Sequence, residues 1–510
     1  MSNNSDSGLL GAVLLARHGD RQGFFQDPFT YTASQTQITA LGSVQEFQLG
    51  QLIRALYFTP GSPTFIQGIS TGLFNQLQVK VRADAGGERG VIFDSAIGLL
   101  QGLFPPTQDY NTTLANGSTI VGQLGGYQPI PIESVEPDQD VSLEGWTDCN
   151  TFNDATLAFY NSSLFQQVAA DNAEFLQSLI PFLDGRSVDL VNMWNIFDFI
   201  NVNFIHNATF ANNLPEGDLN RARALANFHE NGVFSSPQLD GIGNIAGRTI
   251  LPSIFDGMQR ITNQSDPLKF LYEAISYKPF ISLFNMTGIS GTYPELAGVV
   301  EYAAATVFEL RNGSTPDDPL IRLRFKNGTN DEFKTFNMFG QDGDVPLSLF
   351  KSTLEFAAIN TTAEWCKICN NQVDRGCATC NNPHNQNNSD FSVLAKEQLP
   401  TAGSDSEQSV VLVSVPTSQL VEAGLLGSLV TFMAFALAYL VYLFLRKKEN
   451  ALKRGKGGKA DRSYLSFVFN AMTPINNSGS ADFQSGGICD IDAGDKRKVD
   501  SGIPRPLLER

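Results

Sequence analysis

The sequence predicts an α/β domain with an inserted, mainly α-helical cap, followed by a transmembrane helix. Three observations support this fold class. Short apolar runs at residues 9–16 and 78–82 each lead through a loop into a helical pattern, which is typical of strands in a parallel sheet. Residues 107–245 begin as a Gly-, Pro- and Asn-rich loop and continue as polar helices. Residues 423–445 form a run of 23 residues without a charge.

Each of the two N-terminal strands is followed by a predicted helix. Residues 42–57 carry apolar side chains at mostly helical spacing, and residues 91–104 form a second helix that stops at two prolines. Further strand-like runs lie at residues 269–275, 303–310 and 320–325. The turn-rich segment RNGSTPDDP between the last two predicts a hairpin.

These patterns divide the chain into five parts. We predict an α/β domain at 9–106 and 246–381, a helical cap at 107–245, a linker at 382–422, a transmembrane helix at 423–445 and a basic, disordered cytoplasmic tail at 446–510.

Composition excludes some classes of partner. The formal net charge is −17 and the pI is about 4.7, so a nucleic-acid partner is not expected because its phosphates would be repelled. A local arginine pocket can still bind a small phosphate ester. Only four histidines occur, which argues against a metal site built from several histidines. We predict neither a metal nor a cofactor.

The uncharged run at residues 423–445 is long enough to cross a bilayer core of roughly 30 Å. A buried core helix is the alternative, but seven Lys and Arg residues follow directly, and such clusters stay on the cytoplasmic side. The N-terminal part is therefore expected to be lumenal or extracellular. The chain opens without a clear signal peptide. A tail-anchored, cytosolic orientation is the alternative, and we favour a truncated start or an atypical signal.

Glycosylation signals and cysteines agree with that placement. N-linked glycans are predicted at ten sequons, Asn111, Asn116, Asn161, Asn207, Asn263, Asn285, Asn312, Asn327, Asn360 and Asn387. Four cysteines, Cys366, Cys369, Cys377 and Cys380, form a CxxC-x7-CxxC cluster. A zinc site is one interpretation, and two disulfides are the preferred one in an oxidising compartment. Cys149 is then free or joins one of these in a different pairing.

The segment with the clearest chemistry is the loop after the first strand, Ala-Arg-His-Gly-Asp-Arg. Arg17 and Arg21 lie four apart and can converge on one phosphate through charge-assisted hydrogen bonds. The imidazole of His18 between them can attack phosphorus, forming a phosphohistidine that water resolves. The alternative is a surface loop whose side chains form ordinary ion pairs.

Three segments in order extend this pattern: LLARHGDR, ITALGSVQEFQLGQLIR and VKVRADAGGERGVIFDSAIGLLQGLFPP. Together with GRTILPSIFDGMQ and WCKIC they resemble the histidine acid phosphatases, the branch of the histidine phosphatase superfamily that includes phytases. The resemblance covers about residues 9–380. It implies a phosphoglycerate mutase-like three-layer α/β sandwich with a helical cap, and phosphomonoester hydrolysis at acidic pH. It also implies that His18 is the nucleophile and that Arg17, Arg21 and Arg82 clamp the phosphate.

The sequence departs from the family at one catalytic position. The family has a His-Asp pair after a late strand, where the histidine binds phosphate and the aspartate protonates the leaving group. Here Ser276 and Tyr277 occupy that position. Tyrosine, with a reference pKa near 10, is a poor donor at low pH. Asp84 and Glu88 are candidate substitutes, with solvent-exposed loop carboxylates as the alternative for each.

Two functions remain open at this stage. The first is a membrane-anchored acid phosphatase that uses His18 and an unconventional acid. The second is a weak or inactive pseudophosphatase that binds a phosphate-bearing ligand at Arg17, Arg21 and Arg82. We favour the enzyme because the nucleophile is present.

Overall fold

The computed structural model describes residues 8–23, 36–86, 90–313, 315 and 318–380. The predicted linker, transmembrane helix and tail, together with Glu88 and Asn387, lie outside the described residues. Within the described ranges, no helix has the length and apolar character needed to cross a membrane.

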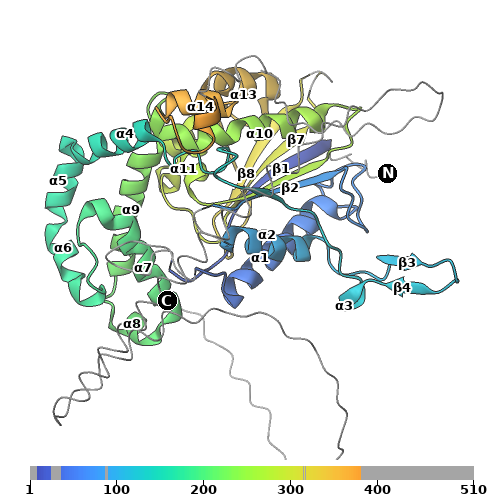
Figure 1. The fold of residues 1–510 in the computed structure, drawn as a ribbon, viewed down its shortest axis with the longest axis horizontal. Coiled ribbons are helices and arrows are strands. Elements are labelled where there is room, and N and C mark those ends of the chain that lie inside the picture. Colours follow the sequence, from blue (N-terminus) through green and yellow to red (C-terminus); the bar gives the residue numbers. More distant parts are fainter. Residues whose placement is uncertain (1–7, 24–35, 87–89, 314, 316–317, 381–510) are drawn as a thin grey trace, which may run out of the picture. The chain divides into compact units, whose positions relative to one another are not determined.

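A mixed β-sheet forms the centre of the molecule (Figure 1). Its strands lie in the order β10-β8-β7-β1-β6-β2-β5, and β9 pairs with β8. Strands β1, β6, β2 and β5 run parallel, whereas the β7, β8, β9 and β10 pairings are antiparallel. The strand bounds are β1 Leu9–Arg17, β2 Val79–Asp84, β5 Glu133–Val135, β6 Phe270–Ile275, β7 Ala305–Arg311, β8 Leu320–Lys326, β9 Lys334–Phe336 and β10 Val345–Pro346.

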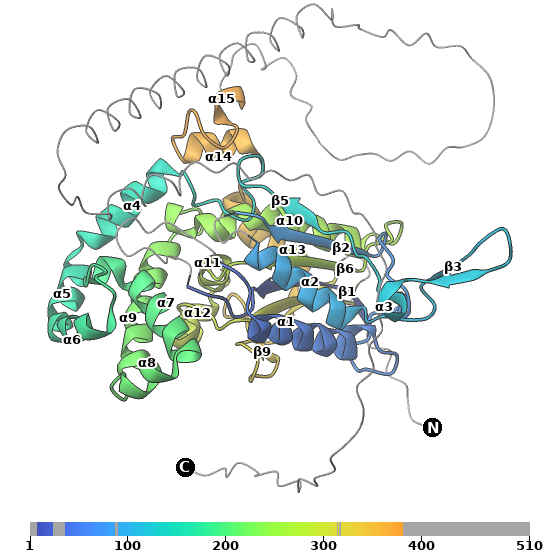
Figure 2. The same ribbon diagram turned by 60° about the horizontal axis from the view of Figure 1, so that its bottom comes forward.

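Helices cover both faces of this sheet (Figures 1 and 2). On one face, α1 (Ala40–Ile53) and α2 (Val91–Leu103) pack on Leu14 and Tyr272. The other face is covered by α10 (Ile245–Thr262), α11 (Lys278–Met286), α13 (Leu347–Leu354) and α14 (Thr362–Ile368). Alternate residues of each strand therefore point into two separate apolar clusters, as the pleat of a sheet requires. The mixed α/β fold class is confirmed.

The N-terminal helix pair packs very closely. A Cβ atom added at Gly50 of α1 would lie 1.9 Å from the carbonyl oxygen of Leu99, and one at Gly102 would lie 2.0 Å from that of Phe47. Only glycine allows the two backbones to approach this far. After Ile53, α1 continues as a short π-helix, Arg54–Phe58.

A second group of helices lies beside one end of the sheet (Figures 1 and 2). These helices pack around their own apolar cluster, which includes Phe165, Ile196 and Leu225. Their bounds are α4 Asn150–Tyr160, α5 Ser163–Asp171, α6 Ala173–Ser178, α7 Met193–His206, α8 Ala208–Asn213 and α9 Asp218–Phe234. Other short elements are β3 Asn111–Thr113, β4 Thr119–Val121, α3 Gln123–Gly126, α12 Ile289–Thr292 and α15 Cys377–Cys380.

Most of the expected elements are present, with one difference. The strands at 9–16, 78–82 and 269–275, and the hairpin of β7 with β8, are confirmed within a few residues. The helical insertion begins later than residue 107, because β5 pairs in parallel with β2 and is part of the central sheet. A short β-strand could not be recognised in the Pro-rich sequence around residue 133.

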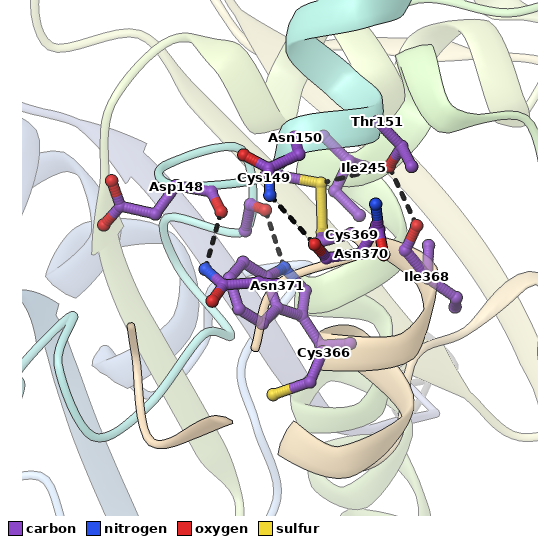
Figure 3. Close-up of a disulfide and its surroundings, with 12 residues drawn as sticks. Asp148, Cys149, Asn150, Thr151, Ile245, Cys366, Ile368, Cys369, Asn370 and Asn371 are labelled. Atoms are coloured by element: carbon purple, nitrogen blue, oxygen red, sulfur yellow. Dashed lines mark hydrogen bonds between the residues drawn. A yellow bond between two sulfur atoms is a disulfide. The ribbon is translucent and has the colours of Figure 1, made fainter. Parts of the chain in front are cut away.

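Two disulfides involve the end of the described chain, and one of them, Cys149–Cys369, joins it to the rest of the molecule (Figure 3). Cys149 bonds to Cys369, across 220 residues, and Cys366 bonds to Cys377. The preferred pairing inside the four-cysteine cluster is therefore wrong for Cys369, because the turn before α4 lies against the end of α14. The alternative, in which Cys149 joins one of these cysteines, is confirmed. The zinc interpretation is excluded for these cysteines. No group of three or more potential metal ligands occurs in the described part of the chain.

Candidate functional site

Sheet register brings two loops together at one edge. In the parallel pair of β1 with β6, Arg17 lies opposite Ile275, so His18 and Ser276 begin neighbouring loops at the carboxyl ends of adjacent strands. The backbone amide of His18 donates to the carbonyl of Ile275 at 3.3 Å. Ligands of open α/β sheets bind at this edge, outside the strand ends.

The start of α1 shapes the loop after β1. The amide of Asp20 donates to the side-chain oxygen of Gln45 at 2.8 Å, and the amide of Gly19 donates to the hydroxyl of Ser95 on α2 at 3.1 Å. A Cβ atom on Gly42 would lie 2.0 Å from the carbonyl oxygen of Asp20. The Gly and Gln of the ALGSVQ motif are therefore needed because helix and loop backbones touch.

His18 is buried and its tautomer is defined by the backbone. Its Nδ1 lies 2.8 Å from the carbonyl oxygen of Gly19. Because a carbonyl oxygen can only accept, Nδ1 carries a proton, and in the neutral ring the lone pair therefore lies on Nε2. This is the form in which an imidazole acts as a nucleophile. The ring centroid of Tyr302 lies 5.6 Å away.

The two arginines of the loop are both buried and line one small cavity. The guanidinium of Arg17 donates to the carbonyl of Val300 and lies 4.5 Å from the ring centroid of Tyr302 and 5.2 Å from that of Tyr277. Arg21 forms an ion pair with Asp198 at 3.0 Å. Burial raises the pKa of Tyr302 to about 12, although Arg21 and Arg17 oppose this shift, so Tyr302 stays neutral.

Further cations and aromatic rings complete the lining of this cavity. It is lined by Arg17, Arg21, Trp194, Phe197, Asp198, Asn201, Arg223, Tyr277, Lys278, Val299, Glu301 and Tyr302. Arg223 is paired with Glu301 at 2.8 Å. Lys278 forms no ion pair with any described residue, and its ammonium lies 4.9 Å from the ring centroid of Trp146. We call this the arginine cavity. Its four cations face two carboxylates, which suits an anionic ligand.

Comparisons of the sequence with known proteins find acid phosphatases. No protein-family profile matches the chain. Bovine (Bos taurus) prostatic acid phosphatase is 22% identical over 368 residues, which cover 70% of this chain and 86% of the relative. Bovine lysosomal acid phosphatase is 22% identical over 371 residues, covering 71% and 81%. Both relatives are histidine acid phosphatases, the family that this sequence resembles.

Solved structures give a weaker likeness. A phytase from Citrobacter braakii is 12% identical and superimposes with a TM-score of 0.49, covering 71% of this chain and 99% of the phytase. A Hafnia alvei phytase in complex with myo-inositol hexakis sulphate is 14% identical, with a TM-score of 0.46 and coverage of 69% and 97%.

One arginine expected at the phosphate of a histidine acid phosphatase lies elsewhere. Arg82 points from β2 toward α10 and lines a different cavity, with its guanidinium paired to Glu273, Glu133 and Asp140 at 3.1, 3.2 and 2.8 Å. Burial lowers its pKa, but the three carboxylates outweigh burial and raise it overall. The structure therefore does not bring Arg82 to Arg17 and Arg21. It lies two residues before the carboxyl end of its strand, where each of its three guanidinium nitrogens donates to a neighbouring carboxylate.

The two residues predicted at the His-Asp position, Ser276 and Tyr277, lie near the arginine cavity. Tyr277 lines the arginine cavity, and its hydroxyl donates to Glu230 at 2.6 Å. Ser276 is buried beside it and lines a second cavity of about 650 Å³. The carboxylate of Asp84 accepts from the amide of Gly86 in the turn after β2, and Asp84 does not line the arginine cavity.

Sequence reasoning missed the contributions of the helical cap. Glu230 comes from α9, while Asp198 and His206 come from α7. His206 Nε2 lies 2.8 Å from a carboxylate oxygen of Asp20, which ties the loop after β1 to the cap. Nothing in the local sequence marks these residues, because their partners lie far away along the chain.

Proposed function

We propose that this chain hydrolyses phosphomonoesters through a phosphohistidine intermediate at His18. The proposal rests on the geometry of the loop after β1. The Gly19 carbonyl accepts from Nδ1 of His18, and Arg17 and Arg21 of the same loop line one cavity. Nε2 attacks phosphorus, and the two guanidinium groups stabilise the charge that develops on the phosphoryl oxygens. Lys278, which has no carboxylate partner among the described residues, takes the clamp position that Arg82 does not fill.

The deciding experiment is hydrolysis of 4-nitrophenyl phosphate between about pH 3 and 7. We expect the full chain to exceed its His18→Ala variant by more than about 10³-fold, because removal of a covalent nucleophile removes the chemical route. Equal rates for the two proteins would contradict the enzymatic function.

The second candidate function is a pseudophosphatase that binds a phosphate-bearing ligand. The specific observation that favours it is the presence of Ser276 and Tyr277 in place of the His-Asp pair. Binding of inorganic phosphate by calorimetry separates the two functions when it is combined with the rate measurement. Phosphate binding that survives His18→Ala but is lost in Arg17→Ala, with no hydrolysis by either protein, supports the pseudophosphatase.

We further propose that residues 8–380 lie in the lumen or outside the cell, anchored through residues 423–445. The two disulfides support an oxidising compartment, and the relatives include lysosomal acid phosphatases. Seven described sequons carry an exposed asparagine: Asn111, Asn116, Asn161, Asn207, Asn263, Asn312 and Asn360. Endoglycosidase treatment of cell-expressed protein should increase its mobility, and unchanged mobility would contradict this placement.

A further inference from the structure

The family's general acid is missing, so the source of the leaving-group proton has to be found in this structure. The described carboxylates that line the arginine cavity are Asp198 and Glu301. Each is paired with an arginine, Asp198 with Arg21 and Glu301 with Arg223, at 3.0 and 2.8 Å. Each carboxylate therefore accepts a hydrogen bond from a guanidinium group, which can only donate. The proton therefore has to come from another kind of group.

Tyr277 is the hydroxyl in this cavity that connects to an acid. Its Oη lies 2.6 Å from Glu230 Oε2, which is hydrogen-bonding distance. Its ring lies near Arg17, with 5.2 Å between the guanidinium carbon and the ring centroid. The phenol thus reaches from the phosphate side of the cavity to a carboxyl group on α9.

Glu230 is held by histidine rather than by arginine or lysine. Its Oε1 lies 2.7 Å from Nδ1 of His229, whose Nε2 lies 2.9 Å from the hydroxyl of Tyr160. Glu230 and His229 are both nearly fully buried, yet both line the cavity of about 650 Å³. Tyr277 lies between this cavity and the arginine cavity, and it lines both.

We propose that Tyr277 and Glu230 form a proton relay that replaces the missing His-Asp acid. This inference rests on the proposed function. As Nε2 of His18 forms its bond to phosphorus, the bond from phosphorus to the ester oxygen breaks. The step starts from Glu230 in its protonated form, in which the carboxyl group donates to the phenol oxygen. The ester oxygen takes the phenolic proton of Tyr277, and Tyr277 takes the carboxyl proton of Glu230. The products of this step are phosphohistidine, the free alcohol and the Glu230 carboxylate.

The second step runs the relay in reverse. Water attacks phosphorus, the bond from phosphorus to nitrogen breaks, and the proton of the water passes through Tyr277 to Glu230. Inorganic phosphate leaves and the Glu230 carboxyl group is restored, so protons balance over the cycle. Tyr277 is the catalytic residue in this scheme, whereas Glu230 acts through it and His229 positions Glu230.

The test compares esters that differ in their need for a proton. The 4-nitrophenolate leaving group departs without one, whereas the alkoxide of glycerol 2-phosphate cannot. We expect Tyr277→Phe and Glu230→Gln each to lower kcat/KM for glycerol 2-phosphate by about 10²–10³-fold, the usual size of general-acid catalysis. The loss for 4-nitrophenyl phosphate should be under about tenfold. Because the two residues act as a unit, the double variant should lose no more than either single variant.

The chain offers a matched control. Tyr57 is also buried and donates its hydroxyl to a glutamate, Glu309, at 2.8 Å, but it lies on the α1 side of the sheet. Tyr57→Phe should leave the ratio of the two substrates unchanged. Glu230→Gln keeps an acceptor for the Tyr277 hydroxyl, so it also controls for packing.

Each outcome decides the inference. Equal losses on the two esters, or an unchanged rate on glycerol 2-phosphate, would overturn the relay while leaving phosphatase function intact. If His18→Ala matches the unaltered protein on 4-nitrophenyl phosphate, the proposed function fails and the relay falls with it. A selective loss on the alkyl ester in both variants supports the relay.

Discussion

At the scale of single residues, one buried carboxyl group stands out. Glu46 of α1 is completely buried, faces α2 and the ring of Tyr272, and neither carboxyl oxygen has a hydrogen-bond partner among the described residues. Burial raises its pKa well above the ordinary range for glutamate. The folded protein therefore keeps a proton on Glu46 at a pH where the unfolded chain has lost it.

This shift makes stability depend on pH. Because the folded state binds more protons, the free energy of unfolding falls as the pH rises above the unfolded pKa of about 4.3. Glu46→Gln removes this titration, so we expect the variant to gain stability relative to the original protein on going from pH 4 to pH 7. Chemical denaturation of both proteins at the two pH values measures this difference in the free energy of unfolding. Identical pH dependence would show that Glu46 is ionised in the fold.

At the scale of elements, Arg82 connects three parallel strands. It lies on β2 and pairs with Glu273 of β6 and Glu133 of β5. Glu273 is fully buried, so Arg82→Ala would leave a buried carboxyl group without its cation. We expect the free energy of unfolding to fall by about 3–5 kcal/mol, with part of it recovered in Arg82→Leu/Glu273→Leu. Chemical denaturation measures the free energy of unfolding of each variant. The phosphate affinity of Arg82→Ala should change far less than that of Arg17→Ala.

A loss of phosphate binding without a loss of stability would instead support the expectation from sequence that Arg82 clamps the phosphate. If Arg82→Ala keeps the stability of the protein but abolishes phosphate binding, the guanidinium turns to the phosphate when ligand is present. The matched variant Arg17→Ala identifies the size of a true clamp effect in the same assay.

The strands and helices around the site could be predicted because their signals are local. Continuous apolar runs and a glycine-containing loop are enough to place β1 and α1, and adjacent loops follow from parallel pairing. Side-chain partners could not be predicted in this way. Tyr277 meets Glu230 across 47 residues and Arg21 meets Asp198 across 177, so both contacts depend on how the cap packs on the sheet.

At the scale of the whole molecule, the site depends on the cap staying in place. The Cys149–Cys369 disulfide links the segment that enters α4 to the end of α14, and hydrogen bonds reinforce the junction, including Asn371 to the Asp148 carbonyl at 2.8 Å (Figure 3). Cap helices supply Asp198 and Glu230, so their placement sets the distances to Arg21 and Tyr277.

Loss of this disulfide should therefore cost both stability and activity. Closure of a loop as long as 220 residues contributes about 5 kcal/mol in the chain-entropy account, whereas the 11-residue loop of Cys366–Cys377 contributes about 3 kcal/mol. We expect Cys149→Ala/Cys369→Ala to lower the free energy of unfolding more than Cys366→Ala/Cys377→Ala. Denaturation of the two double variants, with hydrolysis of glycerol 2-phosphate by each, measures both effects. Equal losses of stability would mean that the unfolded chain is already compact enough to cancel the advantage of the longer loop.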